Sequence, residues 1–200
     1  MCPVFLPRST CLARRIKTQE PRVHRVVYIK SATFRLVTHS DMAETTPDVW
    51  SERRAMAIHE AGHAVASLDL GWVVNYLSID DAEGGNTNVA PGDDPEAQIR
   101  ISLFGREAEE EYGRRAGRPA EPWRTPGAGS HDDWQLARAV AGDDLETSAA
   151  LLREAESECK VALRKTSRWR RIETVAEELD RTGFLSQSRL EELCPVEPWP

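Results

Sequence analysis

One pentapeptide of the sequence could bind a metal ion and carry out hydrolysis with it. Residues 59–63 read His-Glu-Ala-Gly-His, the pattern H-E-x-x-H. Residues four apart share one face of a helix, so the imidazoles of His59 and His63 can grip one zinc ion from adjacent turns. Glu60 lies beside that ion, where its carboxylate can hold a water molecule on the metal and take its proton. The pentapeptide therefore predicts a zinc site with hydrolytic chemistry.

The composition and the neighbouring residues argue against a chance match. The chain has only five histidines in 200 residues, so an accidental H-E-x-x-H is roughly a one-in-a-hundred event. Gly62 stands inside the predicted helix, where glycine costs about 1 kcal/mol relative to alanine, and alanines surround it. Small residues at this place predict that another element of the fold approaches the helix closely.

A third zinc ligand has to come from elsewhere in the chain, because catalytic zinc sites usually have three protein ligands. Asp133 is the first candidate, since apolar residues follow it at offsets of three, four and seven and place it on the inward face of a predicted helix. Asp132 is the alternative ligand, on a less apolar face. Glu109 is a further contender, either as a ligand or as an acceptor that fixes the tautomer of one imidazole.

The helix that carries the motif is the first element with clear boundaries. Thr46-Pro47 supplies a capping hydroxyl and a proline suited to the first helical position, which predicts a helix over about 48–69. Branched and aromatic residues over 73–79 indicate a strand, and a turn at Gly84-Gly85 leads to a second extended segment over 86–90. A small β-hairpin or sheet is thus expected after the motif helix.

The rest of the chain is predicted to be mostly helical. Gly113 is the expected end of the next helix, and the stretch 114–129, rich in Gly, Pro and Arg, is expected to be a loop. The expected fold class is α+β, mainly α. Apolar residues at helical spacing indicate helices over 96–112, 132–141, 144–164, 168–180 and 186–193.

The composition limits the class of protein. A formal net charge of −7 with 40% hydrophobic residues argues against a dedicated nucleic-acid binder. The longest nearly apolar stretch, 61–74, is shorter than the ~20 residues that a membrane-spanning helix needs, so no membrane insertion is expected. The four cysteines form no C-x-x-C pair, which favours a reducing compartment, and we expect a cytoplasmic protein.

Charge divides the chain near Met42. Residues 1–41 hold eight lysines and arginines against two acidic residues, a net charge of +6, whereas the remainder has a net charge of −13. We expect 1–41 to be a basic leader outside the folded domain, either a disordered tail or sequence upstream of a start at Met42. A targeting segment is the alternative, because the stretch is rich in Arg and poor in acidic residues. The domain is then expected over 42–194, followed by a Pro-rich tail over 195–200.

Three segments resemble the peptidase module of FtsH-type ATP-dependent zinc proteases. Residues 57–64, A-I-H-E-A-G-H-A, are similar to the zinc signature of that family. Residues 103–110 resemble its L-x-G-G-R-x-A-E-E helix, with Phe104 in place of the first glycine. Residues 129–137 resemble its G-A-S-N-D-L-x-x-A segment, whose aspartate is a zinc ligand and falls on Asp133. The last predicted helices add a weaker similarity.

The resemblance implies a zinc metalloendopeptidase with His59, His63 and Asp133 as ligands and Glu60 as the catalytic base. Its substrate would be flexible or unfolded polypeptide, paired in extended form with 86–90, which falls where the family has an edge strand. The chain has no G-x-x-x-x-G-K-[ST] phosphate loop, so cleavage is expected to be independent of ATP unless a separate partner delivers substrate.

Two alternatives to a general peptidase stay open at this point. One is a narrow regulatory protease that cuts a single partner. The other is a non-catalytic interaction module that zinc stabilises. The sequence leaves the oligomeric state open.

Overall fold

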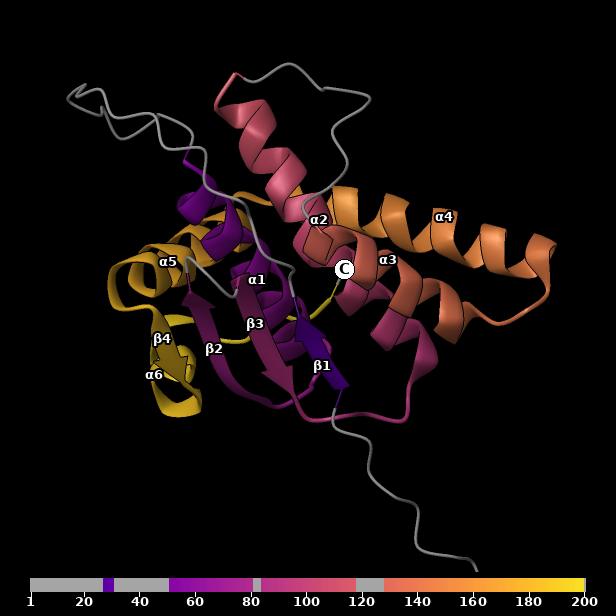
Figure 1. The fold of residues 1–200 in the computed structure, drawn as a ribbon, viewed down its shortest axis with the longest axis horizontal. Helices are drawn as coiled ribbons and strands as arrows, with labels where there is room; N and C mark the ends of the chain where they lie inside the picture. The colour runs from indigo at the N-terminus through magenta and orange to yellow at the C-terminus, as the bar shows by residue number, and fades with distance from the viewer. Residues whose placement is uncertain (1–26, 31–50, 81–83, 118–127, 200) are drawn as a thin grey trace, which may run out of the picture.

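The computed structural model describes residues 27–30, 51–80, 84–117 and 128–199. This part of the chain is mainly helical and contains one small antiparallel sheet, which confirms the α+β, mainly α class (Figure 1). The strands lie in the order β1-β3-β2-β4. The elements are β1 (Val27–Lys30), α1 (Glu52–Asp69), β2 (Val74–Asp80), β3 (Gly84–Val89), α2 (Pro95–Arg115), α3 (Ala128–Ala141), α4 (Leu145–Leu163), α5 (Thr166–Thr182), β4 (Phe184–Ser186) and α6 (Gln187–Leu193).

Helix α1 is the central element of the fold. It packs on the sheet through β2 and β3, with α2 against one side and α5 against another (Figure 1). Every residue from Ala57 to Asp69 is buried, as expected of a helix surrounded by other elements. The helix begins at Glu52, because the hydroxyl of Ser51 accepts a hydrogen bond from the Arg54 amide at 3.0 Å. The predicted start near residue 48 is therefore wrong, and Thr46 and Pro47 lie outside the described residues.

The close approach predicted at Gly62 is confirmed. A Cβ atom added there would lie 2.9 Å from the Cβ of Ala108 and 3.1 Å from the carbonyl oxygen of Phe104, both in α2. These separations leave no room for a side chain, so glycine lets the two helices touch backbone to backbone. The cost of a mid-helix glycine is offset by this packing.

The sheet differs from the predicted hairpin in two ways. Gly84 and Gly85 lie inside β3, opposite Asp80 and Ile79 of β2, rather than in a turn. The other edge of β3 pairs with β1, so β3 is an inner strand and not the edge strand predicted over 86–90. The residues of β1 belong to the segment expected to be a leader, which places at least these four in the sheet. The domain boundary at Met42 stays a prediction.

Two helix ends test the predicted stop signals. α5 ends at Gly183, whose φ of 72° is the left-handed conformation that glycine adopts readily, as predicted. α2 instead continues through Gly113 to Arg115, where Arg114 and Arg115 each lie 2.6 Å from Glu111 Oε1. Basic residues in the last turn also favour the helix terminus. Of the predicted loop over 114–129, residues 118–127 lie outside the described part.

The described residues of the Pro-rich tail, 195–199, contact α1, α5 and α2. Buried Asp69 lies 2.8 Å from both Arg168 and Arg171, and it also accepts a hydrogen bond from the Glu197 amide at 3.0 Å. The ring of Trp199 lies 5.3 Å from that of Phe104 in α2. The described part of the Pro-rich tail is thus held by a buried charge cluster.

No helix within the described ranges combines the length and the apolar character that a membrane-spanning helix needs.

Candidate metal centre

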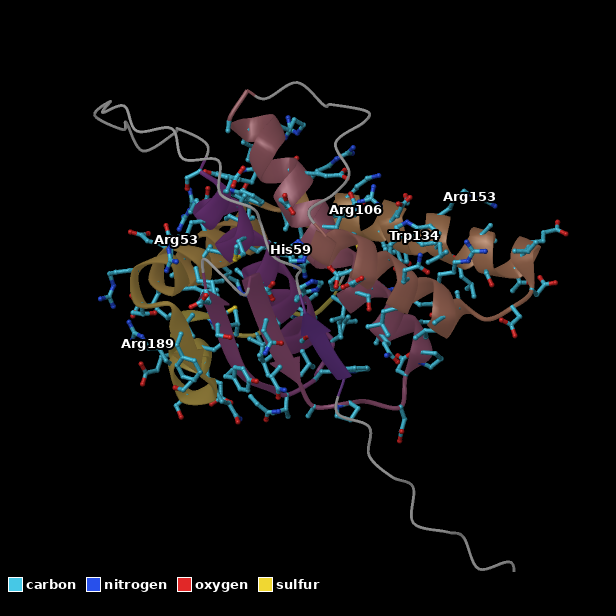
Figure 2. The ribbon with its side chains drawn as sticks, in the orientation of Figure 1. Arg53, His59, Arg106, Trp134, Arg153 and Arg189 are labelled. Atoms are coloured by element: carbon cyan, nitrogen blue, oxygen red, sulfur yellow. The ribbon has the colours of Figure 1, made fainter. Side chains whose placement is uncertain are left out.

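Three buried side chains, two from α1 and one from α3, converge at one point. The Nε2 atoms of His59 and His63 lie 3.0 Å apart. Asp133, from α3, places its Oδ2 atom 2.9 Å from Nε2 of His59 and 3.1 Å from Nε2 of His63. In Figure 2, His59 lies near the middle of the molecule, whereas Trp134, the residue after Asp133, lies farther out along α3. The three residues form a group that could hold a metal ion.

The opposite side of each imidazole is fixed by an acceptor. Nδ1 of His63 donates to the carbonyl oxygen of Ile101 at 2.7 Å, because a carbonyl oxygen can only accept. Nδ1 of His59 lies 3.3 Å from Oε2 of Glu109. With a proton on each Nδ1, both Nε2 atoms present lone pairs towards the Asp133 carboxylate. Such an arrangement needs a cation at its centre, either a proton or a metal ion.

The charges of the group show how strongly it attracts a cation. Burial lowers the pKa of His59, but hydrogen bonds to Asp133 and Glu109 outweigh this effect and raise the pKa well above its ordinary value. Burial raises the pKa of Asp133, yet the charge of His63 and the hydrogen bonds to both histidines bring it down to about 2. Asp133 therefore stays ionised, and positive charge is favoured beside it at neutral pH.

The donor set fits zinc. Two imidazole nitrogens and one carboxylate oxygen are the protein ligands of many catalytic zinc sites, which keep a fourth position for water or substrate. Ligand atoms around tetrahedral zinc, at ~2.0–2.1 Å from the metal, lie roughly 3.3 Å apart, close to the separations of 2.9–3.1 Å found here. In addition, Oδ1 of Asp133 is buried with no hydrogen-bond partner among the described residues. No other group of this kind occurs within the described ranges.

The other two candidate ligands lie outside this group. Asp132 is exposed, on the outer side of α3. Glu109 reaches the far side of His59, in the position predicted for an acceptor that fixes the tautomer rather than for a ligand. The geometry thus favours Asp133 as the third ligand, as the helical spacing indicated.

Glycine and threonine residues that the sequence analysis did not assign to the site also shape it. A Cβ atom at Gly105 of α2 would lie 2.3 Å from Nε2 of His63, so the imidazole fits only against bare backbone. Glu60 is fully buried, and its carboxylate contacts Thr87 and Gly85 of β3. Glycines inside regular elements were the available signal, because each costs stability unless something packs against it.

Comparison with known proteins adds no identification. The chain matches no protein-family model and no curated protein. The similarity to FtsH-type peptidases therefore rests on the three segments of the sequence, and the case for function rests on the geometry of the site.

Proposed function

We propose that this chain is a zinc metalloendopeptidase that hydrolyses peptide bonds in flexible or unfolded polypeptide, without ATP. The observation that carries the proposal is the buried group of His59, His63 and Asp133 with Glu60 next to the first ligand in α1. A site built only to stabilise the fold would be closed by a fourth protein ligand. Three ligands and an adjacent carboxylate are what hydrolysis requires.

His59, His63 and Asp133 would hold the zinc ion. When bound, zinc lowers the pKa of a coordinated water towards about 7 and polarises the scissile carbonyl group. The three side chains carry a single negative charge when both imidazoles are neutral, which leaves a divalent cation only half neutralised. The acceptors at Ile101 and Glu109 keep both rings oriented for binding.

Glu60 is the proposed proton carrier. Its carboxylate accepts a proton from the attacking water and then gives it to the nitrogen of the departing amine, which breaks the peptide bond. Full burial of Glu60 keeps bulk water away from that proton.

The substrate has to reach the site as an extended chain, because the scissile carbonyl must come within bonding distance of a buried ion. Strand β3 contacts Glu60 and would be the natural strand for a peptide to pair with. In the structure β1 occupies that edge and also contacts α3, which carries Asp133 (Figure 1). A peptide could pair with β3 only in place of β1.

The test combines metal content with cleavage. Purified protein should contain close to one zinc per chain and should cut casein, and Glu60→Gln should abolish cleavage while it retains zinc. A tightly folded reporter protein should remain intact, whereas its destabilised variant should be cut. The rate of this cleavage should be the same with and without ATP. Zinc retention with no cleavage of any unfolded reporter would contradict the general peptidase. If the protein then cuts a single partner protein, that result would favour the narrow regulatory protease. If it cuts no protein at all, that result would favour the non-catalytic interaction module.

A further inference from the structure

We propose that Thr87 is a positioning residue for Glu60, whose hydroxyl group holds the carboxylate in the orientation in which it exchanges protons. This inference rests on the proposed function, because it assigns a role in peptide hydrolysis. It concerns a residue of β3, the strand that lies against the motif helix.

The contact between the two side chains is short and buried. The hydroxyl of Thr87 donates to Oε2 of Glu60 at 2.6 Å, and the carbonyl oxygen of Glu60 lies 3.1 Å from the same hydroxyl. Both side chains are completely buried. A separation of 2.6 Å lies at the short end of the ordinary range for a hydroxyl that donates to an oxygen atom, so the contact holds the carboxylate closely. Since both acceptors belong to Glu60, the single proton of the hydroxyl is directed to that residue.

The stability of the strand does not require a hydroxyl at this position. Thr87 lies opposite Leu77 of β2, a buried apolar residue. Valine has the same branched shape and a strong preference for strands, so it would fill this space in β3, but it would leave the buried carboxylate of Glu60 without its hydroxyl donor. The hydroxyl therefore has its use in the bond to Glu60.

Gly85 restricts the same carboxylate from a second direction. It lies two residues before Thr87 and so on the same face of β3. A Cβ atom at Gly85 would lie 2.2 Å from Oε1 of Glu60 and 2.6 Å from its Cγ. The carboxylate thus rests on bare backbone at one end and is bound by a hydroxyl at the other. Together the two contacts restrict the orientation of the Glu60 carboxylate, which a base beside a zinc ligand needs for efficient proton transfer.

The main test compares Thr87→Val with Thr87→Ser in the full chain. Thr87→Val removes only the hydroxyl, so kcat should fall by about 10-fold to 100-fold, a part of the ~10²–10⁴-fold that general acid–base catalysis contributes. KM and the zinc content should stay within twofold of the wild type, because neither depends on the orientation of Glu60. Thr87→Ser restores the hydroxyl and should recover kcat to within about threefold of the wild type.

A matched control and a signal independent of activity complete the test. Thr174→Val removes a hydroxyl that bonds to the Arg170 carbonyl on the exposed side of α5, far from Glu60 in the chain, and should leave kcat unchanged. The ¹³C resonance of the Glu60 carboxyl group, assigned with Glu60→Gln in metal-free protein, should move in Thr87→Val and return in Thr87→Ser. Thr174→Val should not move it.

Each result either supports or overturns the inference. Unchanged kcat in Thr87→Val, equal loss in the valine and serine variants, or loss of zinc in Thr87→Val would each overturn it. If the wild type cuts no peptide, the proposed function fails, and the catalytic role of Thr87 fails with it. The carboxyl resonance still shows in that case whether Thr87 orients Glu60, so the two failures can be told apart.

Discussion

Replacement of Gly105 by alanine should weaken zinc binding strongly while it changes the stability of the metal-free fold only a little. The added Cβ atom would lie 2.3 Å from Nε2 of His63 and 2.6 Å from both ring carbons beside it. Non-bonded carbon contacts are favourable at about 3.5–4.0 Å, so the ring has to move by more than ~1 Å. The ring cannot turn freely, because Nδ1 of His63 is bonded to the carbonyl oxygen of Ile101 at 2.7 Å.

Two opposing effects set the stability of the metal-free Gly105→Ala chain. Alanine is favoured over glycine inside a helix by about 1 kcal/mol, whereas overpacking of a core costs about 1–3 kcal/mol. The free energy of unfolding without zinc should therefore fall by at most ~2 kcal/mol. Zinc binding should suffer more, because a shift of ~1 Å takes Nε2 out of the ~2.0–2.1 Å bonding distance. An affinity loss of about 100-fold removes about 2.7 kcal/mol of stabilisation at a fixed excess of zinc.

The assay is thermal unfolding with and without zinc, together with competition against a chelator of known affinity. The stabilisation by zinc should shrink by about 5–10 °C in Gly105→Ala, given about 2–4 °C per kcal/mol for a domain of this size. Arg106→Ala is the control, because it changes the next residue of α2, which is half-buried and paired with Glu110 at 3.0 Å. Zinc affinity within twofold of the wild type in Gly105→Ala would refute the reasoning.

Asp133→Asn should lose zinc on dialysis against a chelator and Asp132→Asn should retain it, as measured by metal analysis, and the reverse result would contradict the ligand assignment. Burial, aided by Glu110, raises the pKa of Glu107 from 4.5 to about 7, so the folded chain keeps a proton that the unfolded chain releases, and stability falls as the pH rises through this range. The free energy of unfolding of the wild type should therefore decrease by up to about 3 kcal/mol between pH 5 and 8, and this decrease should be absent in Glu107→Gln, whose side chain does not titrate. Urea unfolding at both pH values measures the difference. A chain that begins at Met42 lacks β1 but keeps all three zinc ligands and the described core, so it should retain zinc and melt within a few degrees of the full chain. Because the edge of β3 that β1 occupies is then free, this chain should cut casein faster than the full chain does. Slower cleavage would show that the edge of β3 is not used by substrate.

The parts of the fold with strong local signals could be predicted from the sequence. The motif helix is predictable because the H-E-x-x-H spacing and the surrounding alanines agree with one helical face, and the structure buries residues 57–69 of that helix. The spacing of apolar residues alone predicts Asp133 on the inward face of its helix, and both Asp133 and Ala137 are buried. In each case the periodicity of the chain carries the information, because burial follows the helical repeat.

The parts that were missed depend on contacts between distant segments. β1 and β4 have only four and three residues, too few for a pattern, and each exists through pairing with a strand far away in the sequence. Asp69 and Arg168 would be expected on the surface from their charges, yet both are completely buried at the side chain because they pair with each other. No window of local sequence contains this information.

The glycines are the residues at which a prediction from local sequence differs most from the tertiary structure. Gly84-Gly85 has the sequence of a turn, but Gly85 lies in a strand, where its missing side chain makes room for Glu60. Gly62 and Gly105 lie inside helices, where the intrinsic preference is unfavourable by about 1 kcal/mol each, and they bring α2 against α1 and against the ring of His63. A glycine that interrupts an otherwise regular element is thus better taken as a sign of close backbone approach than as a break. In this chain the missing side chain of Gly85 lets β3 contact Glu60, and that of Gly105 lets α2 contact the metal-binding ring of His63.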